Sequence, residues 1–126
     1  MLGIMIKTKE MIKNYKQYLR VINKNIKLVI EDSQIYLFGS ILEGNLVAAS
    51  DINILIIADI PKSHLKRAEI IANIEEKSGL PLSHPFEFHL LTQEEFDTWN
   101  GIYKIRFEDI SSYIQIIFYN CYFLLN

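Results

Sequence analysis

Two polar residues open an otherwise apolar stretch near the middle of the chain. Asp51 and Asn53 begin the segment DINILIIA, residues 51–58. The segment is short, rich in β-branched side chains and bounded by turn residues, which predicts a strand. Because side chains alternate along a strand, Asp51 and Asn53 point to one face and the intervening Ile52 to the other. The polar pair is either the solvent-exposed start of a strand or part of a site for a cation.

A glycine and a serine stand at a loop's distance before this pair. Gly39 and Ser40 follow a short apolar run, 35–38, which predicts another strand. Gly39 has no Cβ, so its backbone can approach a ligand closely and can adopt positive φ values. Ser40 either caps a following short helix or hydrogen-bonds a phosphate oxygen. Backbone N–H groups at such a turn bind anions, and an anion site beside oxygen ligands suggests a divalent metal bridging a phosphate chain.

These residues together carry a family resemblance. The pattern of Gly39-Ser40, Gly44 and Ser50-Asp51-Ile52-Asn53 resembles the signature of the DNA polymerase β-type nucleotidyltransferase superfamily. It is most similar to the small stand-alone branch, the minimal nucleotidyltransferases of archaea and bacteria. The resemblance covers residues 35–91. It implies an α/β (α+β) fold, in which a small mixed β-sheet has helices packed on one face, and we expect a single domain over residues 1–126.

The resemblance also implies roles for individual residues. Three side chains on neighbouring strands would carry the catalysis and hold the metal, Mg²⁺ or Mn²⁺, and these are Asp51, Asn53 and Glu87. The nucleotide would lie against Gly39, Ser40 and Ser50. The implied reaction is metal-dependent transfer of a nucleotide from ATP, or a similar donor, to a hydroxyl acceptor, including one on a partner protein.

The chain departs from the family pattern in the site itself. Asn53 supplies a neutral amide oxygen where the family has a second carboxylate, which weakens a site for a hard cation. Ile41 and Glu43 stand near positions where relatives carry basic residues. Glu87 is either the third metal-binding acid or a solvated glutamate on an edge strand. His89 shares its face of the strand and either is structural or touches the same site.

Three functions therefore remain open. The first is a metal-dependent nucleotidyltransferase. The second is a catalytically weak or inactive domain that acts as the antitoxin or partner subunit of a HEPN-type helical protein, as minimal nucleotidyltransferases often do. The third is a regulatory ligand-binding domain of the same fold. Metal and nucleotide binding would separate the first from the second.

The composition narrows the class of protein. The chain has 126 residues, of which 50% are hydrophobic and 22% charged, with a formal net charge of −2. This balance is ordinary for one globular domain and does not indicate a general nucleic-acid binder. The single cysteine, Cys121, excludes a disulfide framework within one chain and fits a reducing cytoplasm. The N-terminus shows no signal-peptide pattern.

Periodicity predicts the elements around the site. A helix is expected over about 8–29, with a basic stripe on one side and a core face formed by Met11, Tyr15, Tyr18, Leu19, Ile22 and Ile26. A second helix is expected from the Ser63 cap to about Lys77, before Gly79, with an apolar face of Leu65, Ala68, Ile71 and Ala72. Residues 86–91 predict a strand. Thr92 and Glu95 match a capping box for a helix that ends at Gly101.

The sequence predicts less about the C-terminal segment than about the rest of the chain. Residues 113–125 are almost continuously apolar but too short to span a bilayer, which takes about 20 apolar residues. A segment that is apolar all round is buried in its own domain or against another chain. We expect residues 111–126 to form an interface in a homo-oligomer or with a partner, and the secondary structure of 102–126 stays open.

Overall fold

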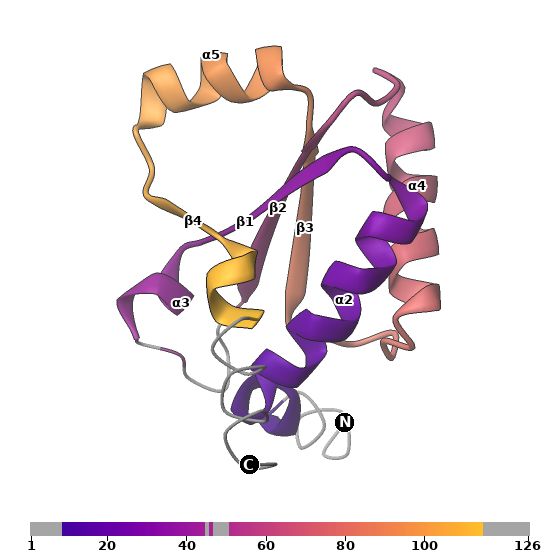
Figure 1. The fold of residues 1–126 in the computed structure, drawn as a ribbon, viewed down its shortest axis with the longest axis vertical. Helices are drawn as coiled ribbons and strands as arrows, with labels where there is room; N and C mark the ends of the chain where they lie inside the picture. Colours follow the sequence, from indigo (N-terminus) through magenta and orange to yellow (C-terminus); the bar gives the residue numbers. More distant parts are fainter. Residues whose placement is uncertain (1–8, 45, 47–50, 115–126) are drawn as a thin grey trace, which may run out of the picture.

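The structure, a computed structural model, describes residues 9–44, 46 and 51–114 (Figure 1). Its elements, in chain order, are α2 (Tyr15–Val29), β1 (Ser33–Phe38), α3 (Ser40–Glu43), β2 (Ile52–Ala58), α4 (His64–Lys77), β3 (Phe86–Leu91), α5 (Gln93–Tyr103) and β4 (Phe107–Asp109). Short helical segments lie at 9–13 and 110–114.

The strands form one mixed four-stranded sheet in the order β3-β2-β1-β4. β1 pairs antiparallel with both β2 and β4, and β2 pairs parallel with β3. The parallel pair is joined by α4, as a crossover connection requires. The α/β (α+β) class and the mixed sheet expected from the sequence are confirmed.

Alternation along the strands divides the core between the two faces of the sheet. One face packs against α2 and α4, and its buried side chains include Leu37, Ile54 and Leu90. The other face packs against α5 and the segment around β4, where Phe38 and Leu55 meet aromatic side chains. β2 is buried from Ile52 to Ala58 except at Asn53, so the central strand reads as an apolar run with one polar interruption.

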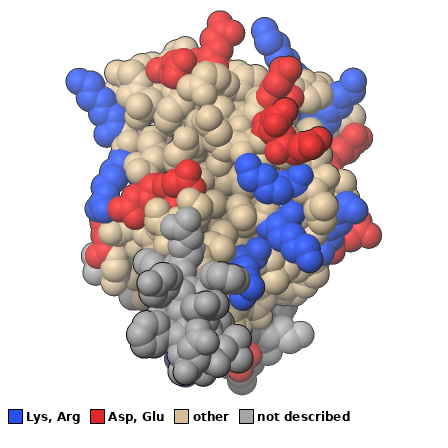
Figure 2. All heavy atoms as spheres, in the orientation of Figure 1, with Lys and Arg blue, Asp and Glu red and all other residues tan. Residues whose placement is uncertain are grey.

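The first long helix confirms its predicted core face. Leu19, Ile22 and Ile26 are fully buried on α2, and Tyr15 and Tyr18 pack against the same cluster. A turn at Asn14 divides the predicted helix into the segment 9–13 and α2. Figure 2 shows Lys and Arg side chains gathered over the side of the molecule that α2 forms, which agrees with the predicted basic stripe.

The predicted apolar face of α4 is confirmed at Ile71, which is partly buried against the core cluster, and is wrong at its other three positions. Leu65 is 71% exposed, and Ala68 and Ala72 are also exposed. The helix instead buries Ile74 and the charged Arg67. Arg67 can face inward because its guanidinium group finds hydrogen-bond acceptors there. The Ser63 cap is confirmed, since its side chain accepts from the Lys66 N–H.

The capping box at the start of α5 is confirmed, and the predicted end of the helix is wrong. The Thr92 side chain accepts from the Glu95 N–H, and the Glu95 side chain accepts from the Thr92 N–H. The helix continues through Gly101 to Tyr103 and ends at Lys104, which adopts φ 49°. Gly101 is exposed inside the helix, and no atom of the described residues lies within 4 Å of a Cβ added to it.

The interface predicted for the C-terminal segment falls mostly on residues outside the described ones. β4 occupies 107–109, and Tyr113 and Ile114 pack partly against the core cluster of α2 and α4. Most of the segment 111–126, for which we expected an interface, lies outside the described residues. None of the helices that the structure describes is long and apolar enough to cross a membrane.

Candidate functional site

Three of the predicted site residues, Gly39, Asn53 and Glu87, are brought together by the register of three strands. Asn53 of β2 is paired with Phe38 at the end of β1 and with Glu87 of β3. Directly paired residues project to the same face of a sheet. Asn53 and Glu87 therefore lie side by side, on the face opposite α2 and α4. Gly39 directly follows Phe38, so the turn at Gly39 lies next to Asn53.

Gly39 fits closely against Asn53. Its backbone has φ 88° and ψ −152°, a conformation open essentially to glycine alone. A Cβ added to Gly39 would lie 2.7 Å from Asn53 Nδ2. The conformation thus requires glycine here, a Cβ would displace the end of the Asn53 side chain, and the turn touches the polar position of β2.

Asn53 is held from the other side by His89. The Nε2 atom of His89 lies 3.1 Å from Asn53 Oδ1 and 3.7 Å from Glu87 Oε1. The imidazole ring also packs on Phe38, with 5.0 Å between ring centroids. Burial lowers the pKa of His89, and the negative charge of Glu87 opposes this shift only in part. The imidazole is therefore neutral at neutral pH.

The acidic residues of the site are open to solvent. Asp51 is exposed and stands one residue before β2. The side chain of Glu87 is 54% exposed on β3, at the edge of the described sheet. Among the described residues, no three His, Cys, Asp or Glu side chains are grouped closely enough to hold a metal ion. Asp51, Glu87 and His89 therefore do not form a ready-made metal cage.

The donor set suits a metal that arrives with its substrate. Mg²⁺ in proteins is usually bound by one or two carboxylates together with substrate phosphates and water. Asp51 and Glu87 offer two carboxylates, and Asn53 Oδ1 keeps a second lone pair beside its bond to His89. The residues present fit a divalent ion bound jointly with a triphosphate.

The turn after β1 differs in detail from the sequence expectation. Gly39, not Ser40, is the N-cap of α3, and Ser40 is its first residue. Ile41 is buried in the core and Glu43 is exposed, so one of the two positions expected to be basic is packed inside the domain. Ser50, expected to touch the nucleotide, lies outside the described residues.

The start of β3 is fixed by a buried histidine. The Phe86 N–H donates to His84 Nδ1 at 3.1 Å, and His84 Nε2 lies 2.5 Å from Glu75 of α4. The Ile52 N–H donates to the Pro85 carbonyl at 2.7 Å. The Ile52–Pro85 bond continues the pairing of β2 with β3 that places Glu87 opposite Asn53.

A buried arginine ties α4 to α5. The Arg67 guanidinium group donates to both carboxylate oxygens of Glu95, at 3.0 and 2.8 Å, and also to the carbonyls of Pro61 and Leu90. This pairing holds α5 over the sheet, where Trp99 packs edge-on against Phe38. The aromatic layer supports Phe38 and, through it, the His89 ring.

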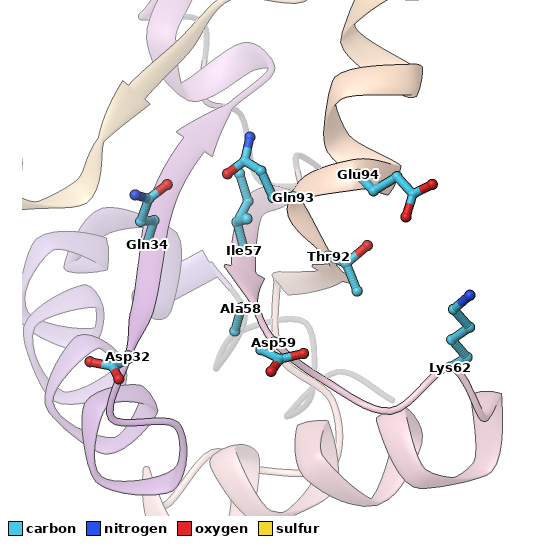
Figure 3. Close-up of a pocket in the computed structure, with 9 residues that line it drawn as sticks. All are labelled: Asp32, Gln34, Ile57, Ala58, Asp59, Lys62, Thr92, Gln93 and Glu94. Atoms are coloured by element: carbon cyan, nitrogen blue, oxygen red, sulfur yellow. The ribbon is translucent and has the colours of Figure 1, made fainter.

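A hollow lies at the other end of the sheet from Asn53 and Glu87. It has a volume of about 490 Å³ and is lined mainly by polar residues, among them Asp32, Asp59, Lys62 and Glu94. Figure 3 shows these side chains around the start of β1, the end of β2 and the start of α5. Asn53 and Glu87 are not part of its lining, so the candidate site and this hollow are separate.

From the sequence, the role of His89 stayed open between a structural residue and one that touches the site. Alternation already placed His89 on the face of Glu87, but its contact with Asn53 depends on the pairing of β2 with β3. The signal available in the sequence was a polar ring two residues after an acid on an apolar strand. The structure brings His89 into contact with Asn53, while the exposed Asp51 stands one residue before β2.

Comparison with known protein families identifies the class of domain. The family model described as a nucleotidyltransferase domain matches residues 12–111. No curated protein matches significantly. A crystal structure at 1.40 Å from Sulfolobus solfataricus, provisionally described as a nucleotidyltransferase, is similar with 20% identity and a TM-score of 0.48, over 75% of this chain and 79% of that one. Because the family model spans most of the sequence, the chain belongs to the nucleotidyltransferase domain family, whose general activity is nucleotidyl transfer.

Proposed function

We propose that this protein is a metal-dependent nucleotidyltransferase that transfers a nucleotide from ATP, or a similar triphosphate, to a hydroxyl acceptor. The observation that carries the proposal is the direct pairing of Asn53 with Glu87 beside the Gly39 turn. With Asp51 one residue before β2, this arrangement presents oxygen ligands next to a glycine turn. The metal proposed is Mg²⁺ or Mn²⁺.

The proposed reaction requires little covalent chemistry from the side chains of the protein. The acceptor oxygen attacks the α-phosphorus, the bond to the bridging oxygen breaks, and pyrophosphate leaves with the electron pair. The acceptor proton passes to a carboxylate or to water. Catalysis therefore rests on positioning and on neutralising charge. A bound divalent ion would supply positive charge at the phosphate oxygens.

The residues of this chain divide these tasks. In the proposal, Asp51, Asn53 and Glu87 are the metal ligands and the catalytic residues, while Gly39, Ser40 and Ser50 lie against the nucleotide. Two carboxylates give the site two fixed negative charges. The triphosphate then completes the ligand set, so metal and nucleotide bind together more tightly than either binds alone.

Calorimetry tests this proposal directly. ATP should bind more tightly with MgCl₂ or MnCl₂ than with EDTA, and Asp51→Asn and Glu87→Gln should each weaken metal–ATP binding about tenfold or more, the size expected for a lost charged contact. Asp59→Asn is the matched control, because Asp59 is exposed just after the other end of β2. Metal–ATP affinity that is unchanged in Asp51→Asn and Glu87→Gln would contradict the assignment. The transfer step itself is followed as pyrophosphate release.

A second candidate function follows from the departures in the same site. Asn53 lacks the charge of a carboxylate, Ile41 is buried, and the exposed Glu43 places a negative charge near the proposed triphosphate. These features favour a weak or inactive site, and as the second candidate we propose a subunit that binds a HEPN-type helical partner as its antitoxin. In that case the purified protein binds no metal–ATP, whereas it forms a defined complex with a HEPN-type protein in light scattering.

A further inference from the structure

The Asn53 carboxamide is held at both ends. Its oxygen lies 3.1 Å from His89 Nε2. Its nitrogen is the atom nearest to Gly39 on the other side, 2.7 Å from where a Cβ would stand. The two ends of the amide therefore face different strands, the oxygen toward β3 and the nitrogen toward the turn after β1.

This orientation of Asn53 corresponds to one tautomer of His89. An amide oxygen only accepts, so His89 Nε2 must carry the proton of the bond. A reversed carboxamide would place its NH₂ group against Nε2 and would require the Nδ1–H form of His89 to accept from it. The Nε2–H form of His89 therefore selects the observed orientation of Asn53, and the ring of His89 is itself held against Phe38 at 5.0 Å.

The selected orientation turns an N–H donor toward the Gly39–Ser40 turn. In the proposed function this turn faces the triphosphate, whose oxygens are acceptors. A carboxylate at position 53 could not donate such a bond. The amide thus offers a contact that the usual carboxylate lacks, on the side of the site where an anion would lie.

We propose that His89 is a positioning residue of the nucleotide site: its bond to Asn53 Oδ1 directs Asn53 Nδ2 toward the Gly39–Ser40 turn, where Nδ2 donates to a triphosphate oxygen. This inference rests on the proposed function. It adds that Asn53 binds the nucleotide directly as well as offering an oxygen to the metal. ATP binding without metal is therefore the sensitive quantity.

The test compares ATP affinity in EDTA among three variants by calorimetry. His89→Phe keeps an aromatic ring against Phe38 and removes the donor, so affinity should fall about threefold to tenfold, as for one net hydrogen bond. His89→Gln can again donate to Asn53 Oδ1 and should recover most of the loss. His64→Phe is the matched control, because His64 is exposed at the start of α4, and its affinity should match the wild type.

The outcomes separate the two proposals. If the wild type binds ATP and His89→Phe binds it equally well, or His89→Gln is as weak as His89→Phe, the inference fails and the proposed function stands. If the wild type binds no ATP with or without metal, both fail. Nitrogen-15 NMR of the ligand-free protein gives an independent reading: the Nε2–H form of His89 is expected, and an Nδ1–H form overturns the inference. Thermal melts show whether His89→Phe is folded.

Discussion

The backbone of Gly39 and the side chain of Asn53 are in such close contact that a β-carbon on Gly39 would lie 2.7 Å from Asn53 Nδ2. The contact joins the turn after β1 to the polar position of β2. It explains why a glycine is needed at this point of the site. It also makes the shape of the turn and the placement of Asn53 depend on each other.

Replacing Gly39 by alanine should damage both stability and the site. The new Cβ meets Asn53 Nδ2, and the backbone at φ 88° and ψ −152° is strained for any residue with a Cβ by about 1–3 kcal/mol. We expect a loss of at least about 2 kcal/mol in the free energy of unfolding, measured in urea, once the clash is added to the strain. Metal–ATP binding should be lost with it.

The control for Gly39→Ala is Gly44→Ala. Gly44 also has a positive φ, 72°, but among the described residues no atom lies within 4 Å of its added Cβ. Its cost should be confined to the left-handed backbone, about 1 kcal/mol. Equal losses in the two variants would show that the contact with Asn53 is unimportant.

Changing Asn53 to aspartate should separate metal binding from direct nucleotide binding. The carboxylate adds a third negative charge at similar size, so Mg²⁺ or Mn²⁺ with ATP should bind more tightly, by about 1 kcal/mol or more for a charged ligand. ATP without metal should bind more weakly, because the Nδ2 donor is gone and the added charge repels phosphate. Calorimetry in MgCl₂ and in EDTA measures both affinities.

The companion variant for Asn53→Asp is Asp51→Asn. It removes a carboxylate from the exposed end of the site and should abolish the metal-dependent gain in ATP affinity. If Asn53→Asp changes neither affinity, position 53 does not contact metal or nucleotide. If metal fails to strengthen ATP binding in the wild type, in Asn53→Asp and in Asp51→Asn, the role as a non-catalytic partner is favoured.

Replacing Arg67 by methionine should destabilise the domain without touching the site directly. The Arg67 side chain is 10% exposed and the Glu95 side chain is 43% exposed. Solvent therefore screens the ion pair from the side of Glu95. The variant loses bonds to Glu95 and to two backbone carbonyls, which should cost about 2–3 kcal/mol, below the range for a fully buried pair. Arg106→Met removes an exposed pair with Glu108, whose arginine side chain is 66% exposed, and should cost at most about 1 kcal/mol. Urea unfolding compares the two.

Acid should weaken the same pairing. Hydrogen bonds from the Arg67 side chain, and then from the Thr92 backbone, lower the pKa of Glu95 from 4.5 to about 2. A carboxylate with a lowered pKa in the folded state stabilises above its unfolded pKa, and this contribution disappears as the pH falls toward 2. The difference in unfolding free energy between the wild type and Glu95→Gln should therefore be largest at neutral pH and should shrink between about pH 5 and pH 2.

Glu94→Gln is the control for this pH dependence. Glu94 lies on the same first turn of α5 and forms no ion pair among the described residues. Its difference from the wild type should vary much less over the same range. A pH-independent difference for Glu95→Gln would show that the bond to Arg67 contributes little to stability.

Local sequence signals were enough to identify most of the elements. The apolar run after Asp51, the cap at Ser63 and the Thr92–Glu95 box each act within a few residues, so each is visible along the chain. Alternation within one strand is equally local, and it was enough to place His89 on the face of Glu87. The Gly39–Ser40 and Asp51–Asn53 pattern pointed to the nucleotidyltransferase family, and the match over 12–111 confirms it.

The tertiary structure decided which of these residues come into contact. Asn53 faces Glu87 because β2 and β3 pair in one register, and that register joins segments far apart in sequence, which no local pattern specifies. The inward turn of Arg67 contradicted the apolar periodicity of α4, because a buried charge follows its hydrogen-bond partners on other elements. Short-range spacing sets secondary structure, whereas the contacts of Asn53 with Gly39 and His89 come from side chains that lie far apart in sequence and are brought together only by packing.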